Sequence, residues 1–172
     1  MKDDKIVLYM HAGSGNHGCE AIVNSLCRML PKPAILMTNR PKEDETYSLK
    51  ELCSSFVQEK SIEKNVFVHT WYYLKRKLLH DPDCFMEYRY QDICGKNLHR
   101  LNISIGGGNY CYDNMLDRLI SANRMFHKQG AKTVLYGCSI EPELLKRPEI
   151  MEDMKRYDAI IARESLTFAA LQ

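Results

Sequence analysis

Several features that would assign a protein class at once are missing from this chain of 172 residues. No apolar run reaches the roughly 18 residues of a membrane span, and the N-terminus has no signal-peptide core followed by a cleavage site. The formal net charge is only +2, with both signs scattered, so no concentrated basic patch suggests nucleic acid. The seven cysteines include no Cys-x-x-Cys pair, so neither a zinc site nor a disulfide framework is readable. We therefore expect a cytoplasmic protein that does not span a membrane and binds neither nucleic acid nor a metal.

The sequence instead alternates short apolar runs with segments of helical period, which is typical of a parallel sheet. Most of the runs are apolar throughout, as expected of strands that helices cover on both sides. We expect strands at residues 6–10, 34–38, 101–105, 133–136 and 159–162, with a further short strand at 55–58. The pattern predicts an α/β fold, a Rossmann-like parallel sheet with helices on both faces.

Apolar residues at helical spacing predict three helices, and we expect each apolar stripe to face the core. The stripes are Ile22, Leu26, Met29 and Leu30; Phe67, Trp71, Leu74 and Leu78; and Leu116, Leu119, Ile120 and Phe126. A fourth helix is expected to open at Arg147-Pro148, because proline suits the first helical turn. We interpret the basic run Lys75-Arg76-Lys77 as a solvated helix face. Residues 40–95 otherwise carry few sharp signals, and we expect them to flank the sheet.

The loop after the first strand is the first place to look for a ligand, because open α/β sheets bind ligands at the carboxyl ends of their strands. Its candidate residues are Ser14, Gly15, Asn16, His17 and Glu20. The spacing Gly13-x-Gly15-x-x-Gly18 fits the dinucleotide template, but no acid closes the second strand, and the Lys-Ser/Thr of a P-loop is absent. A tight turn without a ligand explains this segment equally well. His17 is a candidate acid or base, or simply a hydrogen-bonding loop residue.

The segment after the strand at 101–105 is rich in glycine. It consists of Gly106, Gly107, Gly108 and Asn109. Each glycine costs roughly 0.5–1 kcal/mol relative to alanine in regular structure, so three in a row indicate a sharp turn or the close approach of a ligand. Strand-to-helix packing is the alternative explanation.

Arg163 follows the strand at 159–162 and stands beside an expected helix start with Ser165 as its N-cap. The planar guanidinium suits bidentate contact with a carboxylate or a phosphate. An ion pair with Glu164 or Glu20, or packing on Tyr157, explains the same residue without a ligand.

Four segments resemble, in order and spacing, the polysaccharide pyruvyl transferase family across essentially the whole chain. They are Gly-Asn-His-Gly-Cys-Glu-Ala at 15–21, Ile-Gly-Gly-Gly-Asn at 105–109, Tyr-Gly-Cys-Ser-Ile-Glu-Pro at 136–142 and Arg-Glu-Ser-Leu-Thr at 163–167. The resemblance implies that residues 1–164 are the Rossmann-like N-terminal domain of a two-domain, GT-B-like enzyme. Residues 165–172 would then begin a helix that leads to a second domain outside this chain.

The resemblance also implies a reaction, in which phosphoenolpyruvate gives its pyruvyl group to a sugar as a ketal during surface-polysaccharide synthesis. Arg163 matches the family arginine that fits donor binding. The cleft would be lined by Ser14, Gly15, Asn16, His17, Glu20, Gly106, Gly107, Gly108, Asn109 and Ser165. The general acid is expected in the second domain, so this chain alone would be a half-site. We expect no cofactor, and a homo-oligomer stays open.

One departure from the family is Cys19, where many relatives carry aspartate. Two other functions also stay open at this point, since a GT-B-like half equally serves sugar-nucleotide-dependent glycosyltransferases. The chain also fits a non-catalytic fragment that only binds a ligand or another chain.

Overall fold

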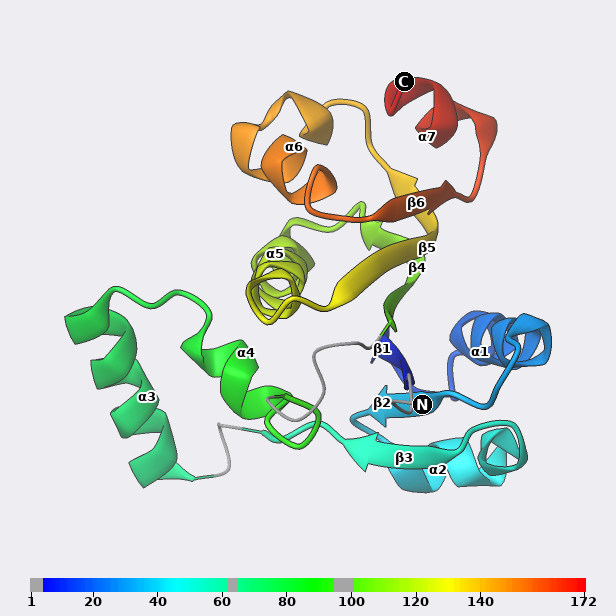
Figure 1. Ribbon diagram of the computed structural model, residues 1–172, viewed down its shortest axis with the longest axis horizontal. Helices are drawn as coiled ribbons and strands as arrows, with labels where there is room; N and C mark the ends of the chain where they lie inside the picture. Colours follow the sequence, from blue (N-terminus) through cyan, green and yellow to red (C-terminus); the bar gives the residue numbers. More distant parts are fainter. Residues whose placement is uncertain (1–4, 62–64, 95–100) are drawn as a thin grey trace.

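The protein is described by a computed structural model over residues 5–61, 65–94 and 101–172. Six parallel strands form one sheet in the order β3-β2-β1-β4-β5-β6 (Figure 1). The strands are β1 (Ile6–His11), β2 (Ile35–Thr38), β3 (Ser55–Gln58), β4 (Leu101–Tyr110), β5 (Lys132–Ile140) and β6 (Ala159–Ala162). The strand order reverses at β1, because β2 and β3 lie on one side of it and β4, β5 and β6 on the other. Doubly wound sheets bind ligands at this switch point, between β1 and β4.

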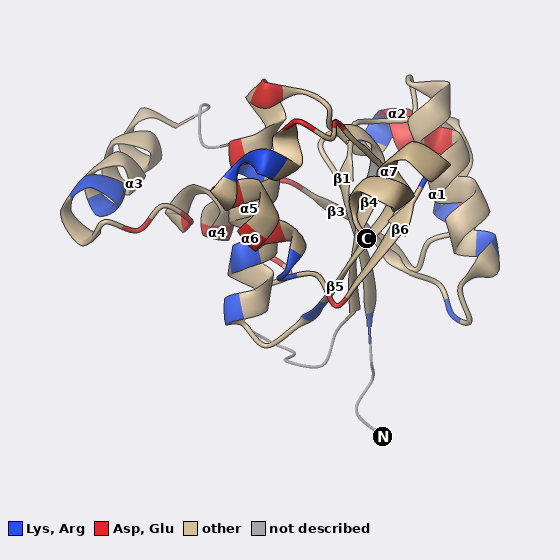
Figure 2. Ribbon diagram, turned by 90° about the horizontal axis from the view of Figure 1, so that it is seen from above, with Lys and Arg blue, Asp and Glu red and all other residues tan. Residues whose placement is uncertain are grey.

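Helices cover both faces of the sheet. On one side lie α1 (His17–Met29) and α2 (Pro41–Thr46), and on the other lie α4 (Cys84–Arg89), α5 (Asp113–Lys128) and α6 (Pro148–Met154) (Figures 1 and 2). The last helix, α7 (Ser165–Ala170), follows β6 at the end of the sheet, and its Ala170 packs against the core layer under α5 and α6. Two short 3₁₀ turns, Leu49–Glu51 and Leu144–Lys146, fill the connections. The α/β, Rossmann-like prediction is therefore confirmed.

The core consists of two apolar layers, one on each face of the sheet. The layer under α5 contains Tyr9, Phe126 and Tyr90, whose rings meet at centroid separations of 5.0 to 6.3 Å. The layer under α1 contains Leu8 and Leu36, both fully buried. Because both faces of β1 are covered, its six residues are all buried, as the apolar run at 6–10 indicates.

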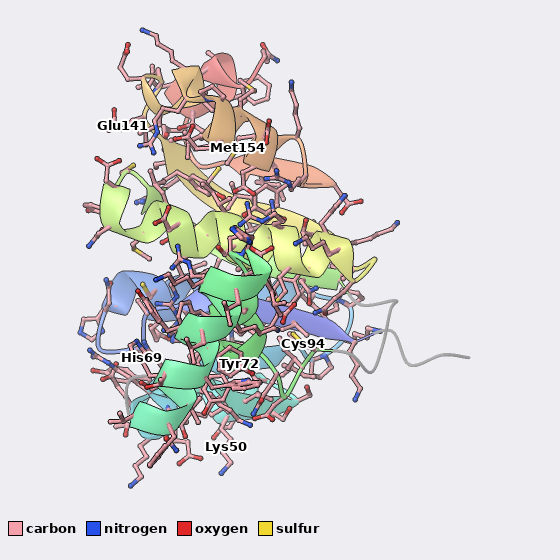
Figure 3. The ribbon with its side chains drawn as sticks, turned by 90° about the vertical axis from the view of Figure 1, so that its left-hand side faces the viewer. Lys50, His69, Tyr72, Cys94, Glu141 and Met154 are labelled. Carbon is pink, nitrogen blue, oxygen red and sulfur yellow. The ribbon has the colours of Figure 1, made fainter. Side chains whose placement is uncertain are left out.

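Two of the three expected stripes depart from the core. Met29 of the first stripe, at the end of α1, is 71% exposed. The larger departure is in the second stripe. The stripe of α3 (Val66–Leu79) was expected to be buried, yet Phe67 is 88% and Trp71 67% exposed, and Leu74 and Leu78 are exposed as well. The reason is that α3 packs on α4 through another face, where Tyr72 lies against Tyr88 with ring centroids 5.1 Å apart (Figure 3). An apolar stripe at helical spacing does not show whether another part of the protein covers it.

Two strands run further than expected. β4 continues through the glycines to Tyr110, and β5 continues to Ile140, so both segments expected as loops are strand ends. The pairing of β4 with β5 shifts register between Gly107 and Tyr110, where Gly107 has φ of +103°. Within the described ranges, no helix has both the length and the apolar character needed to cross a bilayer.

Candidate functional site

The four motif segments meet at one edge of the sheet. Residues 15–21 follow β1, and the other three segments stand at the carboxyl ends of β4, β5 and β6. These four strands are neighbours in the sheet, so their carboxyl ends form one continuous edge (Figure 1). We call this edge, made by residues 13–20, 106–112, 137–142 and 163–167, the carboxyl edge.

The first loop uses its amide groups within the protein. The amide of Ser14 donates to Asp44 Oδ1 at 3.0 Å, and the amide of Gly15 donates to Glu43 Oε1 at 2.5 Å. Asn16 is the N-cap of α1, since its Oδ1 accepts from the amides of Gly18 and Cys19. Acids on α2 thus occupy the place where an anion would approach the loop (Figure 2). The amides of Ser14 and Gly15 are therefore already bonded within the protein.

The glycines at 13 and 15 lie against α2. A Cβ built on either residue would lie 2.8 Å from Glu43 Oε1, so the end of that flexible side chain would have to move. Gly13 also has φ of +103°, a conformation that L side chains rarely adopt. Backbone conformation therefore accounts for Gly13, and the contact with Glu43 disfavours a side chain at Gly15.

Behind the loop lies a buried carboxylate, Asp44. Its Oδ1 accepts from Ser14 Oγ at 2.6 Å and lies 2.9 Å from His11 Nε2, and its other oxygen accepts from Thr38 Oγ1. Burial raises the pKa of Asp44, but the hydrogen bonds from Ser14, Thr38 and His11 outweigh it and hold the pKa below its usual value. Because Ser14 is fully buried and donates to a carboxylate, its position suits bracing the loop.

The other candidates of this loop lie nearer the surface. His17 is exposed, and its ring meets that of Tyr47 edge-on at 5.7 Å between centroids. Glu20 is half-buried in the first turn of α1, and its Oε1 accepts from Asn24 Nδ2 at 3.3 Å. Both side chains therefore remain near enough to solvent to meet a substrate.

The end of β4 is a bulged strand held by its own asparagine. Asn109 Nδ2 donates to the carbonyl of Ile105 at 2.8 Å, which bridges the three glycines. A Cβ on Gly107 would meet nothing within 4 Å, whereas one on Gly108 would lie 3.1 Å from the ring of Tyr112. Open space at Gly107 leaves its backbone accessible to a neighbouring molecule.

The last two motifs are tied together by Glu164. Its carboxylate accepts from Ser139 Oγ at 2.7 Å and from Thr167 Oγ1, and these bonds lower its pKa. The hydroxyl of Thr167 accepts from the amide of Ile140 at 3.0 Å. Glu164, rather than Ser165, is the N-cap of α7, so Ser165 is the first helical residue and is exposed. The ends of β5 and β6 therefore form one hydrogen-bonded unit.

Arg163 is exposed at the centre of this unit. Its amide donates to the carbonyl of Cys138 at 2.9 Å, which fixes the backbone. Each partner that could hold the guanidinium has another contact: Glu164 bonds Ser139, Glu20 bonds Asn24, and the hydroxyl of Tyr157 lies 3.0 Å from that of Tyr110. Among the described residues, no carboxylate forms an ion pair with Arg163, so its guanidinium is available to an anion in solvent.

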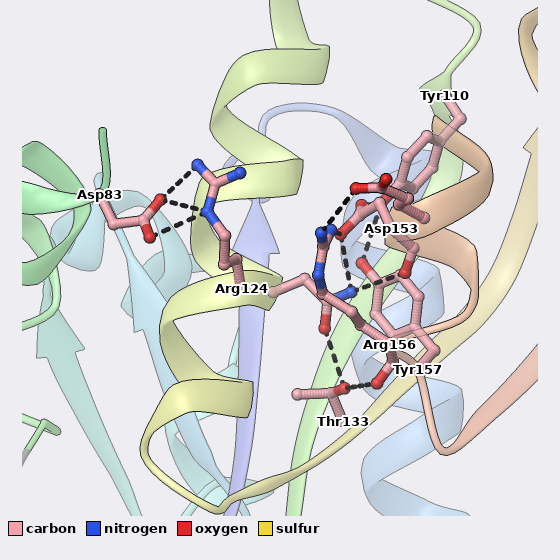
Figure 4. Close-up of polar contacts among 9 residues, drawn as sticks. Asp83, Tyr110, Arg124, Thr133, Asp153, Arg156 and Tyr157 are labelled. Atoms are coloured by element: carbon pink, nitrogen blue, oxygen red, sulfur yellow. Dashed lines mark hydrogen bonds and ion pairs between the residues drawn. The ribbon is translucent and has the colours of Figure 1, made fainter. Parts of the chain in front are cut away.

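A second buried polar cluster supports the edge from below. Tyr110, the last residue of β4, donates to Asp153 Oδ2 at 2.6 Å, and Asn123 Nδ2 donates to Asp153 Oδ1 at 2.9 Å (Figure 4). Burial raises the pKa of Asp153 despite these hydrogen bonds, and it raises the pKa values of Tyr110 and Tyr157 as well. The cluster fixes β4 to α5 and α6, so the bulged strand end has a rigid base.

Sequence reasoning missed Asp44, Glu43 and His11 entirely. The available signal was local: Pro41 followed by acids predicts a helix N-terminus, which is what α2 has. Nothing in the sequence indicates that this helix would approach a loop some 30 residues earlier in the chain. In the part of the chain that the structure describes, no three His, Cys, Asp or Glu side chains converge to hold a metal ion.

Comparisons with family models, with curated proteins and with solved structures found no match in any of the three. The case for a function therefore depends on the motifs and on the geometry of the carboxyl edge.

Proposed function

We propose that the carboxyl edge binds phosphoenolpyruvate through Arg163 and forms one wall of a polysaccharide pyruvyl transferase site. The proposal is supported by one observation above all: the four segments that resemble the family follow four neighbouring strands, and among them stands an exposed arginine that forms no ion pair with any residue that the structure describes. Phosphoenolpyruvate carries a phosphate and a carboxylate, and a guanidinium fork matches either group.

The proposed reaction transfers the pyruvyl group to two hydroxyls of a sugar. A general acid protonates the methylene carbon of the donor, which makes the neighbouring carbon electrophilic. The first sugar hydroxyl adds to that carbon, the C–O bond to phosphate breaks, and the second hydroxyl closes the ketal. Of the two hydroxyl protons, one balances the new methyl group and one leaves with the phosphate.

In this scheme Arg163 holds the donor and stabilises the charge that collects on the departing phosphate. The accessible backbone at Gly107 and the exposed ring of His17 would face donor or acceptor across the same edge. The general acid is assigned to a part of the enzyme outside this chain. We infer a cytoplasmic location, because none of the seven cysteines is in a disulfide.

Direct titration of the protein with phosphoenolpyruvate tests the proposal. Arg163→Ala should weaken binding by roughly tenfold or more, the effect of losing one charge-assisted contact. Lys132→Ala is the matched control, since it removes one exposed positive charge at the amino end of β5, away from the carboxyl edge. A nucleotide sugar serves as competitor. Displacement of the donor by the nucleotide sugar at equal or lower concentration would favour a glycosyltransferase instead.

A further inference from the structure

A cavity of about 390 Å³ opens between α4 and α5, on the face of the molecule where α3 packs (Figure 3). Five cationic side chains line it. They are Lys60, Arg76, Arg89, Arg118 and Arg124. Lys60 follows β3, whereas Arg163 follows β6, so the cavity and the proposed donor site lie toward opposite edges of the sheet. The proposed function makes no use of this cavity.

Two of the arginines share one buried carboxylate. Arg118 Nη2 lies 2.5 Å from Glu59 Oε2, and Arg89 Nη1 lies 3.1 Å from the same oxygen. The side chain of Glu59 is 1% exposed, and its other oxygen accepts from the hydroxyl of Tyr90 at 3.2 Å. The carboxylate thus orients both guanidinium groups but neutralises only one of them.

A second pair of cations repeats this arrangement. Asp83, 1% exposed, accepts from Arg124 Nη2 at 2.6 Å (Figure 4). It also accepts from Lys128 Nζ at 2.8 Å. Both partners lower the pKa of Asp83 below its usual value, against the opposing effect of burial, so the carboxylate is charged at neutral pH. The positive charge left over is that of Lys128, which is 59% exposed and does not line the cavity.

Arg76 contributes a third charge that no described carboxylate offsets. Its guanidinium lies 5.7 Å from the ring centroid of Phe85, in the geometry of a cation–π contact. Two acids also line the cavity, Asp117 and Glu149, and Glu149 is paired with Arg147 at 2.7 Å. The remaining lining cation, Lys60, is paired with Asp92 at 3.0 Å. Because Lys128 does not line the cavity, the uncompensated lining charges are Arg76 and one of the two arginines at Glu59, which against Asp117 leave an excess of one positive charge.

The cavity also offers an apolar wall. Pro82, Phe85 and Met86 form the wall beside the cations. A planar or apolar group would pack there, while an anionic group would reach the guanidinium forks.

We propose that this cavity binds a small phosphate monoester with a planar or apolar body. A phosphate monoester carries close to two negative charges at neutral pH, so a cavity with a cationic lining attracts it. Its oxygens accept bidentate contacts from Arg76 and Arg118.

Calorimetric titration with phenyl phosphate tests the proposal, with inorganic phosphate and phenol as the two halves of the probe. Wild-type protein should bind phenyl phosphate more tightly than either half. Arg76→Ala should weaken binding roughly tenfold or more. Lys77→Ala is the control, because Lys77 is also exposed, is adjacent in α3 and does not line the cavity. Equal losses in the two variants, or no binding by wild type, would overturn the proposal.

Two further variants keep this test independent of folding and of the donor site. Arg118→Lys retains the charge beside Glu59 but lacks the planar guanidinium fork, so we expect weaker binding of phenyl phosphate, and the unfolding midpoint of each variant is recorded beside its affinity. Arg163→Ala should leave phenyl phosphate binding unchanged, and loss of binding in that variant would show that no separate site exists. If inorganic phosphate bound as tightly as phenyl phosphate, the apolar wall would contribute nothing to binding, and the planar or apolar body assigned to the ligand would be wrong.

Discussion

Replacing Asp44 by alanine is expected to destabilise the fold strongly, although the residue lies on a helix of only six residues. The carboxylate accepts four hydrogen bonds: from the amide and hydroxyl of Ser14, from His11 Nε2 and from Thr38 Oγ1. All of these side chains are buried, so water does not replace the lost acceptor. Removing one partner from a buried, charged network costs about 3–5 kcal/mol. That is a large share of the roughly 5–15 kcal/mol that holds a domain folded.

Urea unfolding at pH 7 measures this difference through the midpoint at constant slope. Glu43→Ala is the matched control, because Glu43 neighbours Asp44 on α2 and accepts one hydrogen bond from the same loop, but its side chain is 28% exposed. We expect that variant to lose about 1 kcal/mol. If Asp44→Ala lost no more than Glu43→Ala, the buried network would not be what braces the loop.

Three further outcomes follow from burial, backbone conformation and charge. Gly13→Ala should destabilise more than Gly107→Ala in urea, because both have φ of +103° but only the first would place a Cβ 2.8 Å from another atom; equal losses would contradict this. Phe126→Ala should lower the free energy of unfolding by about 3–5 kcal/mol, because Phe126 is fully buried. Phe67→Ala should change it by no more than about 0.5 kcal/mol, because Phe67 is 88% exposed, and a large loss there would mean that this face of α3 is covered. Stability should fall as the pH drops below about 4, because Asp83 has a folded-state pKa below its usual 3.8; its contribution is present above that value and lost as pH falls through the folded pKa. Asp83→Asn should therefore give a shallower loss of stability in acid.

The strands were predictable because each is a short apolar run whose burial needs no knowledge of the partner strand. β1, β2 and β6 begin within one residue of the predicted positions, and β3 matches the weakly marked segment at 55–58. The ends of β4 and β5 were not predictable, because glycines at 106–108 and at 137 indicate a loop unless the neighbouring strand is known. Pairing across the sheet keeps them in strand conformation.

The helix α3 shows the limit of periodicity. An apolar stripe at helical spacing indicates that one face prefers burial, but Tyr72 and Lys75 carry the contacts to α4 instead. Burial of a stripe requires a surface to cover it, and that surface is a tertiary property.

The polar networks were unpredictable for a different reason. Glu59 is bonded to Arg118, and Asp83 to Arg124, across 59 and 41 residues of chain. The local sequence around Glu59 and around Asp83 predicts only a charged side chain at the surface. Only the packing of α4 on α5 makes these carboxylates buried, and that packing also creates the cationic cavity. The candidate residues at the strand ends, in contrast, could be located from the topology alone.

The central claim is that Arg163 at the carboxyl edge binds phosphoenolpyruvate. Isothermal titration of wild-type protein, Arg163→Ala and Lys132→Ala with phosphoenolpyruvate tests it most directly, with urea midpoints recorded for each. Since Arg163 has no ion pair among the described residues, its replacement should leave the midpoint unchanged while weakening binding roughly tenfold or more. Lys132→Ala should bind as wild type does. Equal affinity in all three proteins, or no measurable binding of phosphoenolpyruvate at all, would contradict the claim.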